Sequence, residues 1–185
     1  MSEDRAAALE TSIKERLLDA QRHLQTLEYA AAVFGADFEL APFEDAWRSA
    51  VAAQLARAYA VQAGYENVIN ACVRISQDLC RLEGWSSGAV ELSSIEALKL
   101  LHEHGVISAG TRTALKDAQE RRSDVQHDYV NVAAREIHQA ARQLIEHAPL
   151  LLQEVAGQLR QRRRRPPNHG ITRVPRRARP TSRGG

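Results

Sequence analysis

The chain contains few of the residues that interrupt helices or build sheets. Its 185 residues include ten glycines and six prolines, and Pro42 is the sole proline before Pro149. Aromatic residues make up 5% of the chain, whereas apolar residues make up 44%, with abundant Ala, Leu and Val. Ala and Leu favour helices, and aromatic residues are enriched in strands. This composition predicts an all-α fold.

Long apolar segments are also missing. No apolar run approaches the roughly 18 residues that a membrane-spanning helix requires. The N-terminal sequence MSEDRAAALE is charged and has no apolar centre of the kind found in signal peptides. We therefore expect a cytoplasmic protein that neither crosses a membrane nor is exported.

Motifs that hold metals or phosphate groups are not found in the sequence. His102 and His104 are two residues apart in a predicted helix and would point different ways, and His138 and His147 have no partners at ligand spacing. No glycine-rich phosphate loop and no serine nucleophile elbow is present. We expect neither a metal site nor a cofactor.

The chain has two cysteines, Cys72 and Cys80, in a segment that we interpret as one helix. Eight residues of helix separate their Cα atoms by about 12 Å. This distance is too long for a disulfide between them. We expect buried or half-buried free thiols in a reducing compartment, with a redox or metal pair as the alternative.

Acidic residues are absent from the C-terminal segment 160–185, which contains ten arginines. Subtracting these ten from the 25 basic residues leaves 15 against 23 acidic ones, so residues 1–159 carry a net charge of −8. We predict one helical domain over 1–159 and a disordered basic tail over 160–185. The tail has three interpretations: non-specific RNA contact, docking on an acidic partner or on the acidic body, or a solubilising segment.

Apolar residues recur every three or four positions along most of the domain, which predicts an antiparallel bundle of about five helices. The first helix is expected over 4–34, and the second from Pro42 to Leu82 with a bend near Gly64. The other expected features are a loop over 83–88, a short helix capped by Ser93 and closed at Gly105, a fourth helix capped by Ser108 or Thr111, and a fifth over 130–159 that is kinked or broken at Pro149.

The densest polar cluster of the domain spans residues 120–129. Cleavage of RNA without a metal needs a group that exchanges protons near neutral pH, and the imidazole of His127 suits this role. It also needs fixed positive charge beside the phosphate, which the guanidinium of Arg122 would supply. The sequence therefore indicates Arg122 and His127 as a candidate catalytic pair.

Helix geometry restricts how this pair can act. Five residues along a continuous helix rotate two side chains apart by about 140°, so Arg122 and His127 would diverge. Tyr129, seven residues from Arg122, would share its face. A helix break between Arg122 and His127, or a second copy of the motif related by a twofold axis, would bring both groups to one phosphate.

Arg122, His127 and Tyr129 form an R-x4-H-x-Y motif that resembles that of the HepT branch of the HEPN (higher eukaryotes and prokaryotes nucleotide-binding) superfamily. The similarity covers roughly residues 10–156 and includes the helix pattern. It implies a toxin of a toxin–antitoxin pair, an endoribonuclease that acts as a homodimer or a dimer-based higher oligomer, with Arg122 and His127 as catalytic residues. It also implies that Tyr129 is the position that an MntA-like nucleotidyltransferase antitoxin modifies with AMP.

Neighbouring polar residues would support the pair. The family usually has Asn, Asp or another strongly polar residue after the arginine, where this chain has the shorter Ser123. The remaining supporting candidates are Arg121, Asp124 and Asp128. These charges also have a simpler interpretation, as a solvated corner with weak local ion pairs.

Two other functional hypotheses remain open. In the first, the chain is a non-catalytic HEPN adaptor or nucleotide-binding module that partners a nucleotidyltransferase. In the second, it is a helical interaction protein in which the motif occurs by chance. An adaptor would not cleave RNA, whereas a nuclease would. If the motif occurs by chance, substitution of Arg122, His127 and Tyr129 would leave the function of the chain unchanged.

Overall fold

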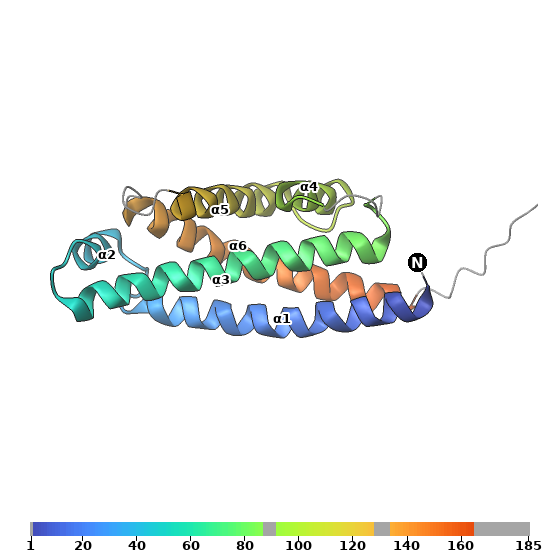
Figure 1. The fold of residues 1–185 in the computed structure, drawn as a ribbon, viewed down its shortest axis with the longest axis horizontal. Helices are drawn as coiled ribbons and strands as arrows, with labels where there is room; N and C mark the ends of the chain where they lie inside the picture. Colours follow the sequence, from blue (N-terminus) through green and yellow to red (C-terminus); the bar gives the residue numbers. More distant parts are fainter. Residues whose placement is uncertain (1, 87–91, 128–133, 165–185) are drawn as a thin grey trace, which may run out of the picture.

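The fold is built from helices, as the composition predicted. The structure, a computed structural model, describes residues 2–86, 92–127 and 134–164, without the side chains of 124–127 and 163–164. These residues contain six helices and no strand (Figure 1). The helices are α1 (Glu3–Ala32), α2 (Leu40–Trp47), α3 (Ala52–Glu83), α4 (Ser94–Glu103), α5 (Ala109–His127) and α6 (Ala134–Arg164).

Three long helices, α1, α3 and α6, pack lengthwise against one another and enclose most of the core (Figure 1). The expected stripe of α1 is buried throughout, at Ile13, Leu17, Ala20, Leu24, Leu27 and Ala31. Helices α4 and α5 follow each other along one side of this layer, where α4 contacts α3 and α5 contacts α6. None of the described helices is long and apolar enough to span a membrane.

The expected second helix is in fact two helices, so the prediction of one helix from Pro42 to Leu82 was wrong. Residues 48–51 separate α2 from α3. There the Ser49 hydroxyl accepts a hydrogen bond from the backbone N–H of Val51 at 3.0 Å, and Val51 is extended. Such local side-chain bonds compete with helical hydrogen bonding, and they let the chain turn between two apolar stripes. Helix α3 then continues through Gly64 without interruption.

Capping residues set the starts of α4 and α5. The Ser93 hydroxyl accepts a hydrogen bond from the N–H of Glu96 at 3.2 Å, which confirms the predicted cap of α4. Of the two candidate caps for α5, Ser108 is the one used, because its hydroxyl accepts from the N–H of Thr111 at 3.1 Å. Gly105, between these helices, adopts the left-handed conformation that glycine tolerates best.

The last helix, α6, runs through Pro149 as one element and ends at Arg164, five residues beyond the expected limit of the domain. In this extension Arg162 forms an ion pair with Glu83 at the end of α3, at 3.3 Å. Residues 160–164 are therefore helical. The rest of the expected basic tail, 165–185, lies outside the described residues.

Both cysteines are buried free thiols, as predicted. Burial raises the pKa of Cys72 and of Cys80 to about 12, because the thiolate would lose its hydration in the core. Both side chains are therefore protonated packing residues at neutral pH.

Candidate active site

The backbone of α5 carries both residues of the candidate pair. The helix is continuous from Ala109 through His127, so no break separates Arg122 from His127. The two positions are therefore about 140° apart around one helix axis. The described backbone therefore excludes the arrangement that depends on a helix break between them.

The described residues include only part of the expected site. Tyr129 and Asp128 lie in segment 128–133, outside the described residues. The backbones of His127 and Asp124 are helical, but their side chains are not among those described. Ser123 is exposed on α5.

Arg121 points toward α6 and forms an ion pair with Glu136, with 3.6 Å between Nη1 and Oε1. Both side chains are partly exposed, so the pair contributes little to stability. Arg121 thus lies on a different side of α5 from its neighbour Arg122. Its ion pair is of the weak local kind expected if these charges form a solvated corner.

Arg122 lines a polar cleft of about 340 Å³ between α1, α3, the first residue of α4, and α5. Its Nε is buried and has no hydrogen-bond partner among the described residues. The same holds for Oε1 of Gln119, one turn earlier on α5. Buried polar atoms are nearly always paired, so unpaired ones indicate that water or a ligand completes them.

The cleft is strongly basic. Arg122 shares it with Arg16 from α1 and with Arg74 and Arg81 from α3, whereas Asp78 is the single acidic residue among the described lining residues. The net charge of these five side chains is +3. An excess of guanidinium groups in a partly desolvated cleft favours a phosphate group, because each guanidinium can donate two parallel hydrogen bonds to its oxygens.

Asp78 fixes two of these arginines. Its carboxylate is 6% exposed and lies 3.1 Å from Nε of Arg16 and 3.0 Å from Nη1 of Arg81. One side chain from α1 and one from α3 therefore contact different oxygens of a single carboxylate. The cleft wall is therefore held in shape without a ligand.

The cleft residues outside residues 120–129 were not predicted from the sequence. A signal for some of them was present, because polar residues recur at helical spacing along one face of α3, at Asn70, Arg74, Gln77 and Arg81. No sequence pattern connects Arg16 with them. Its place in the cleft follows from the packing of α1 against α3.

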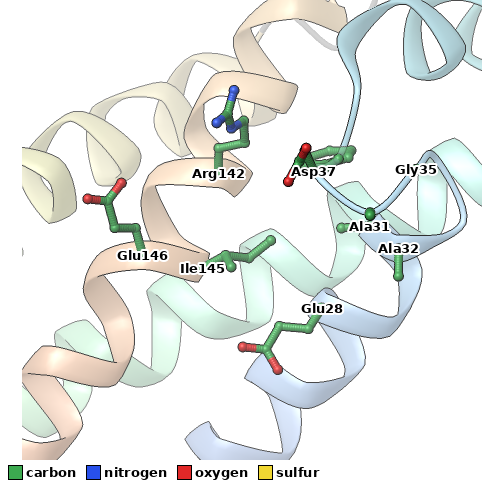
Figure 2. A pocket seen from close by; sticks show the side chains of 10 residues that line it. Glu28, Ala31, Ala32, Gly35, Asp37, Arg142, Ile145 and Glu146 are labelled. Atoms are coloured by element: carbon green, nitrogen blue, oxygen red, sulfur yellow. The ribbon is translucent and has the colours of Figure 1, made fainter.

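A second hollow, of about 400 Å³, lies between α1 and α6 and has the opposite charge. Figure 2 shows Arg142 and Glu146 on α6, Asp37 after the end of α1, and Glu28 on α1. Three carboxylates against one guanidinium disfavour a phosphate ligand. The described residues also hold no group of three or more His, Cys, Asp or Glu side chains that could bind a metal ion. Of these two hollows, the one at Arg122 is the better candidate for an RNA site.

Comparison with known proteins identifies the relationship. A family model described as "Ribonuclease HepT-like" matches residues 39–155, which include α2 to α5 and most of α6. No curated protein and no solved structure matches the chain. The matched segment contains the whole R-x4-H-x-Y motif and excludes α1. The chain therefore belongs to the HepT-like ribonuclease family, which makes it an endoribonuclease of the HEPN toxin class.

Proposed function

We propose that the chain is the toxin of a toxin–antitoxin pair and cleaves RNA, without a metal ion, at a site shared by two protomers. The observation that carries this proposal is the buried Nε of Arg122, which has no partner among the described residues and lies in a cleft of charge +3. The Arg122 side chain is partly exposed in this cleft, so its other guanidinium N–H groups would donate to a bound phosphate. The family match over residues 39–155 supplies the reaction class.

The proposed reaction is transfer of the scissile phosphate to the neighbouring 2′-oxygen. The 2′-oxygen bonds to phosphorus as it loses its proton, the bond from phosphorus to the 5′-oxygen breaks, and the leaving oxygen gains a proton. His127 acts as the general base or the general acid. Arg122 donates to the non-bridging oxygens, where negative charge builds up in the transition state.

A homodimer, or an oligomer built from dimers, explains how the two groups meet. Because α5 is continuous, Arg122 and His127 of one chain sit at positions about 140° apart around the helix. A twofold axis beside this end of α5 would set Arg122 of one protomer against His127 of the other. Each dimer then contains two equivalent sites.

The proposed antitoxin is an MntA-like nucleotidyltransferase that transfers AMP to Tyr129. Tyr129 follows His127 by two residues, so an attached AMP adds bulk and negative charge beside the catalytic imidazole. Both effects exclude an RNA phosphate from the site. Modification at this one tyrosine would therefore silence the toxin.

The test is an RNA-cleavage assay of the wild-type chain and of His127→Ala, with a chelator present throughout. Loss of a general acid–base group should slow cleavage by roughly a hundredfold or more. His23→Ala, on α1, is the matched control and should cleave at the wild-type rate. Equal cleavage by His127→Ala and the wild type would remove His127 from the mechanism.

The adaptor hypothesis is tested by co-expression with a nucleotidyltransferase. Intact-mass measurement should show added AMP on the wild-type chain and none on Tyr129→Phe. The unmodified wild type should cleave RNA and the modified chain should not. A mass increase at Tyr129 without cleavage by the unmodified chain would instead establish a non-catalytic adaptor.

A further inference from the structure

The basic cleft contains more arginines than a single scissile phosphate requires. We propose that Arg16, Arg74 and Arg81 form a phosphate-binding subsite that holds the RNA backbone next to Arg122. This inference rests on the proposed nuclease function, because Arg122 belongs both to the catalytic pair and to the cleft. It assigns a substrate-binding role to residues that lie outside the R-x4-H-x-Y motif.

The ion pairs within the subsite leave positive charge available. Asp78 is shared by Arg16 and Arg81, and one carboxylate neutralises one of these two guanidinium groups. Arg74 lines the same cleft, is exposed, and forms no ion pair with the described residues. An incoming phosphate therefore meets an accessible guanidinium at Arg74, in the same cleft as the partly exposed side chain of Arg122.

The lining indicates which part of an RNA is held. Among the described residues, the cleft lining includes no aromatic side chain on which a base could stack, and Val73 is the one apolar residue. Its other uncharged members are the polar side chains of Asn70, Gln77, Ser94 and Gln119. A volume of about 340 Å³ accommodates a phosphodiester with its sugar. The subsite would thus bind the sugar–phosphate backbone, independently of base sequence.

The net charge of the domain favours RNA binding at the cleft over binding elsewhere on the domain. Residues 1–159 carry a net charge of −8, so this domain taken as a whole repels RNA. Within residues 1–159, apart from the arginine-rich segment 160–185, a cleft of charge +3 is a local site of attraction for RNA. RNA would therefore be guided to the cleft that contains Arg122.

The subsite also gives α1 a function. Arg16 lies before residue 39, where the family match begins, yet it reaches the cleft through its ion pair with Asp78. The first helix would thus extend the substrate-binding surface of the family domain. This part of the site belongs to a region that the family model does not cover.

The test measures RNA binding without cleavage. The probe is a fluorescein-labelled single-stranded RNA of mixed sequence, and every variant carries His127→Ala so that the RNA stays intact. We expect Arg74→Ala and Arg16→Ala each to weaken binding by roughly tenfold. Each should also reduce the slope of log K against log salt by about 0.7, as expected for one lost phosphate contact on a single strand.

Arg57→Ala is the matched control, because Arg57 is an exposed arginine on α3 that does not line the cleft. It should leave both the Kd and the salt slope unchanged. If Arg74→Ala and Arg16→Ala behave like Arg57→Ala, the subsite is wrong, whereas loss of cleavage in His127→Ala alone would still support the nuclease. Arg74 is exposed, so its variant should keep the wild-type melting temperature. Cleft variants that lose antitoxin binding while keeping RNA affinity would overturn the inference in favour of a protein-docking surface.

Discussion

At the residue scale, buried polar residues are of two kinds: some hold the cleft side chains in place, and others pack in the core. Asp78 belongs to the first kind, because its two arginine partners both line the cleft. His138 on α6 belongs to the second kind, since it is 6% exposed and contacts the ring of Phe38 at 4.3 Å between centroids. Each kind predicts a different response to substitution or to pH.

Replacing Asp78 by Ala should destabilise the fold by about 2 kcal/mol, because two guanidinium groups lose their shared buried carboxylate. Urea unfolding followed by circular dichroism measures the change. Asp19→Ala is the control, since Asp19 is exposed and pairs with the exposed Arg22. That control should change stability by less than about 0.5 kcal/mol. Equal midpoints for Asp78→Ala and the wild type would show that the two ion pairs do not support the cleft.

Protonation of His138 should weaken the fold as the pH falls. Burial lowers the pKa of His138, the nearby charge of Arg142 adds to this effect, and the hydrogen bond to the carbonyl of Phe38 and the charge of Glu44 oppose it. Because Nε2 lies 2.6 Å from that carbonyl oxygen, the neutral ring donates its Nε2 proton to it.

The folded-state pKa is therefore below that of the unfolded chain, which binds more protons as the pH falls past about 6.5. The contribution of neutral His138 to stability should be complete well above about pH 6.5 and should decline as the pH falls through and below this value. Urea unfolding at several pH values measures the decline. In His138→Gln the decline should be smaller, and an identical pH dependence in both chains would exclude His138 as its source.

At the element scale, periodicity predicted the positions of most helices. The stripes of α1 and α6 and the caps of α4 and α5 depend on residues close together in sequence, so they could be deduced from it. The break between α2 and α3 could not, because both helices continue the same apolar spacing. It depends on a local hydrogen bond of Ser49 and on Phe43, which contacts Phe34 and Phe38 in an aromatic cluster.

In the candidate site, too, residues close together in sequence could be predicted, and residues brought together by packing could not. Arg122 and His127 lie within one short segment, so their chemistry could be predicted from sequence. Arg16, Arg74 and Arg81 come from two other helices, and three-dimensional packing alone brings them to Arg122. Tyr129 stays a prediction, since segment 128–133 lies outside the described residues.

The contact between α1 and α3 predicts an effect at Gly64. A Cβ atom added there would lie 3.1 Å from Cα and 3.2 Å from Cβ of Leu27, a buried residue near the C-terminal end of α1. Alanine favours helices by about 1 kcal/mol over glycine, but overpacking of a tight helix contact costs about 1–3 kcal/mol. Gly64→Ala should therefore lower the free energy of unfolding.

Gly157→Ala is the matched control for this change. Gly157 lies within α6, and the nearest atom to an added Cβ is the flexible end of Arg160 at 3.8 Å. This variant should be about 0.5–1 kcal/mol more stable than the wild type, through helix propensity alone. Thermal unfolding of both variants tests the pair of predictions. Stabilisation by Gly64→Ala would show that α1 and α3 do not press together at this point.

At the scale of the whole molecule, an acidic helical domain carries a basic cleft, and the proposed twofold assembly would complete the active site. Because α5 is continuous, each proposed site would take Arg122 from one chain and His127 from the other. The cleft adds arginines from α1 and α3. An isolated protomer should bind RNA through its cleft but should cleave it slowly. Dilution below the dimer dissociation constant should accordingly reduce the cleavage rate per chain.

The most direct measurement is cleavage by a mixed dimer in which one protomer carries Arg122→Ala and the other His127→Ala. The two chains are co-expressed with different affinity tags, and the dimer that carries both tags is purified. If each site takes Arg122 from one protomer and His127 from the other, one intact site remains and the dimer keeps about half of the wild-type activity. The two single-variant homodimers should both be inactive. A mixed dimer as inactive as those homodimers would contradict a site shared between protomers.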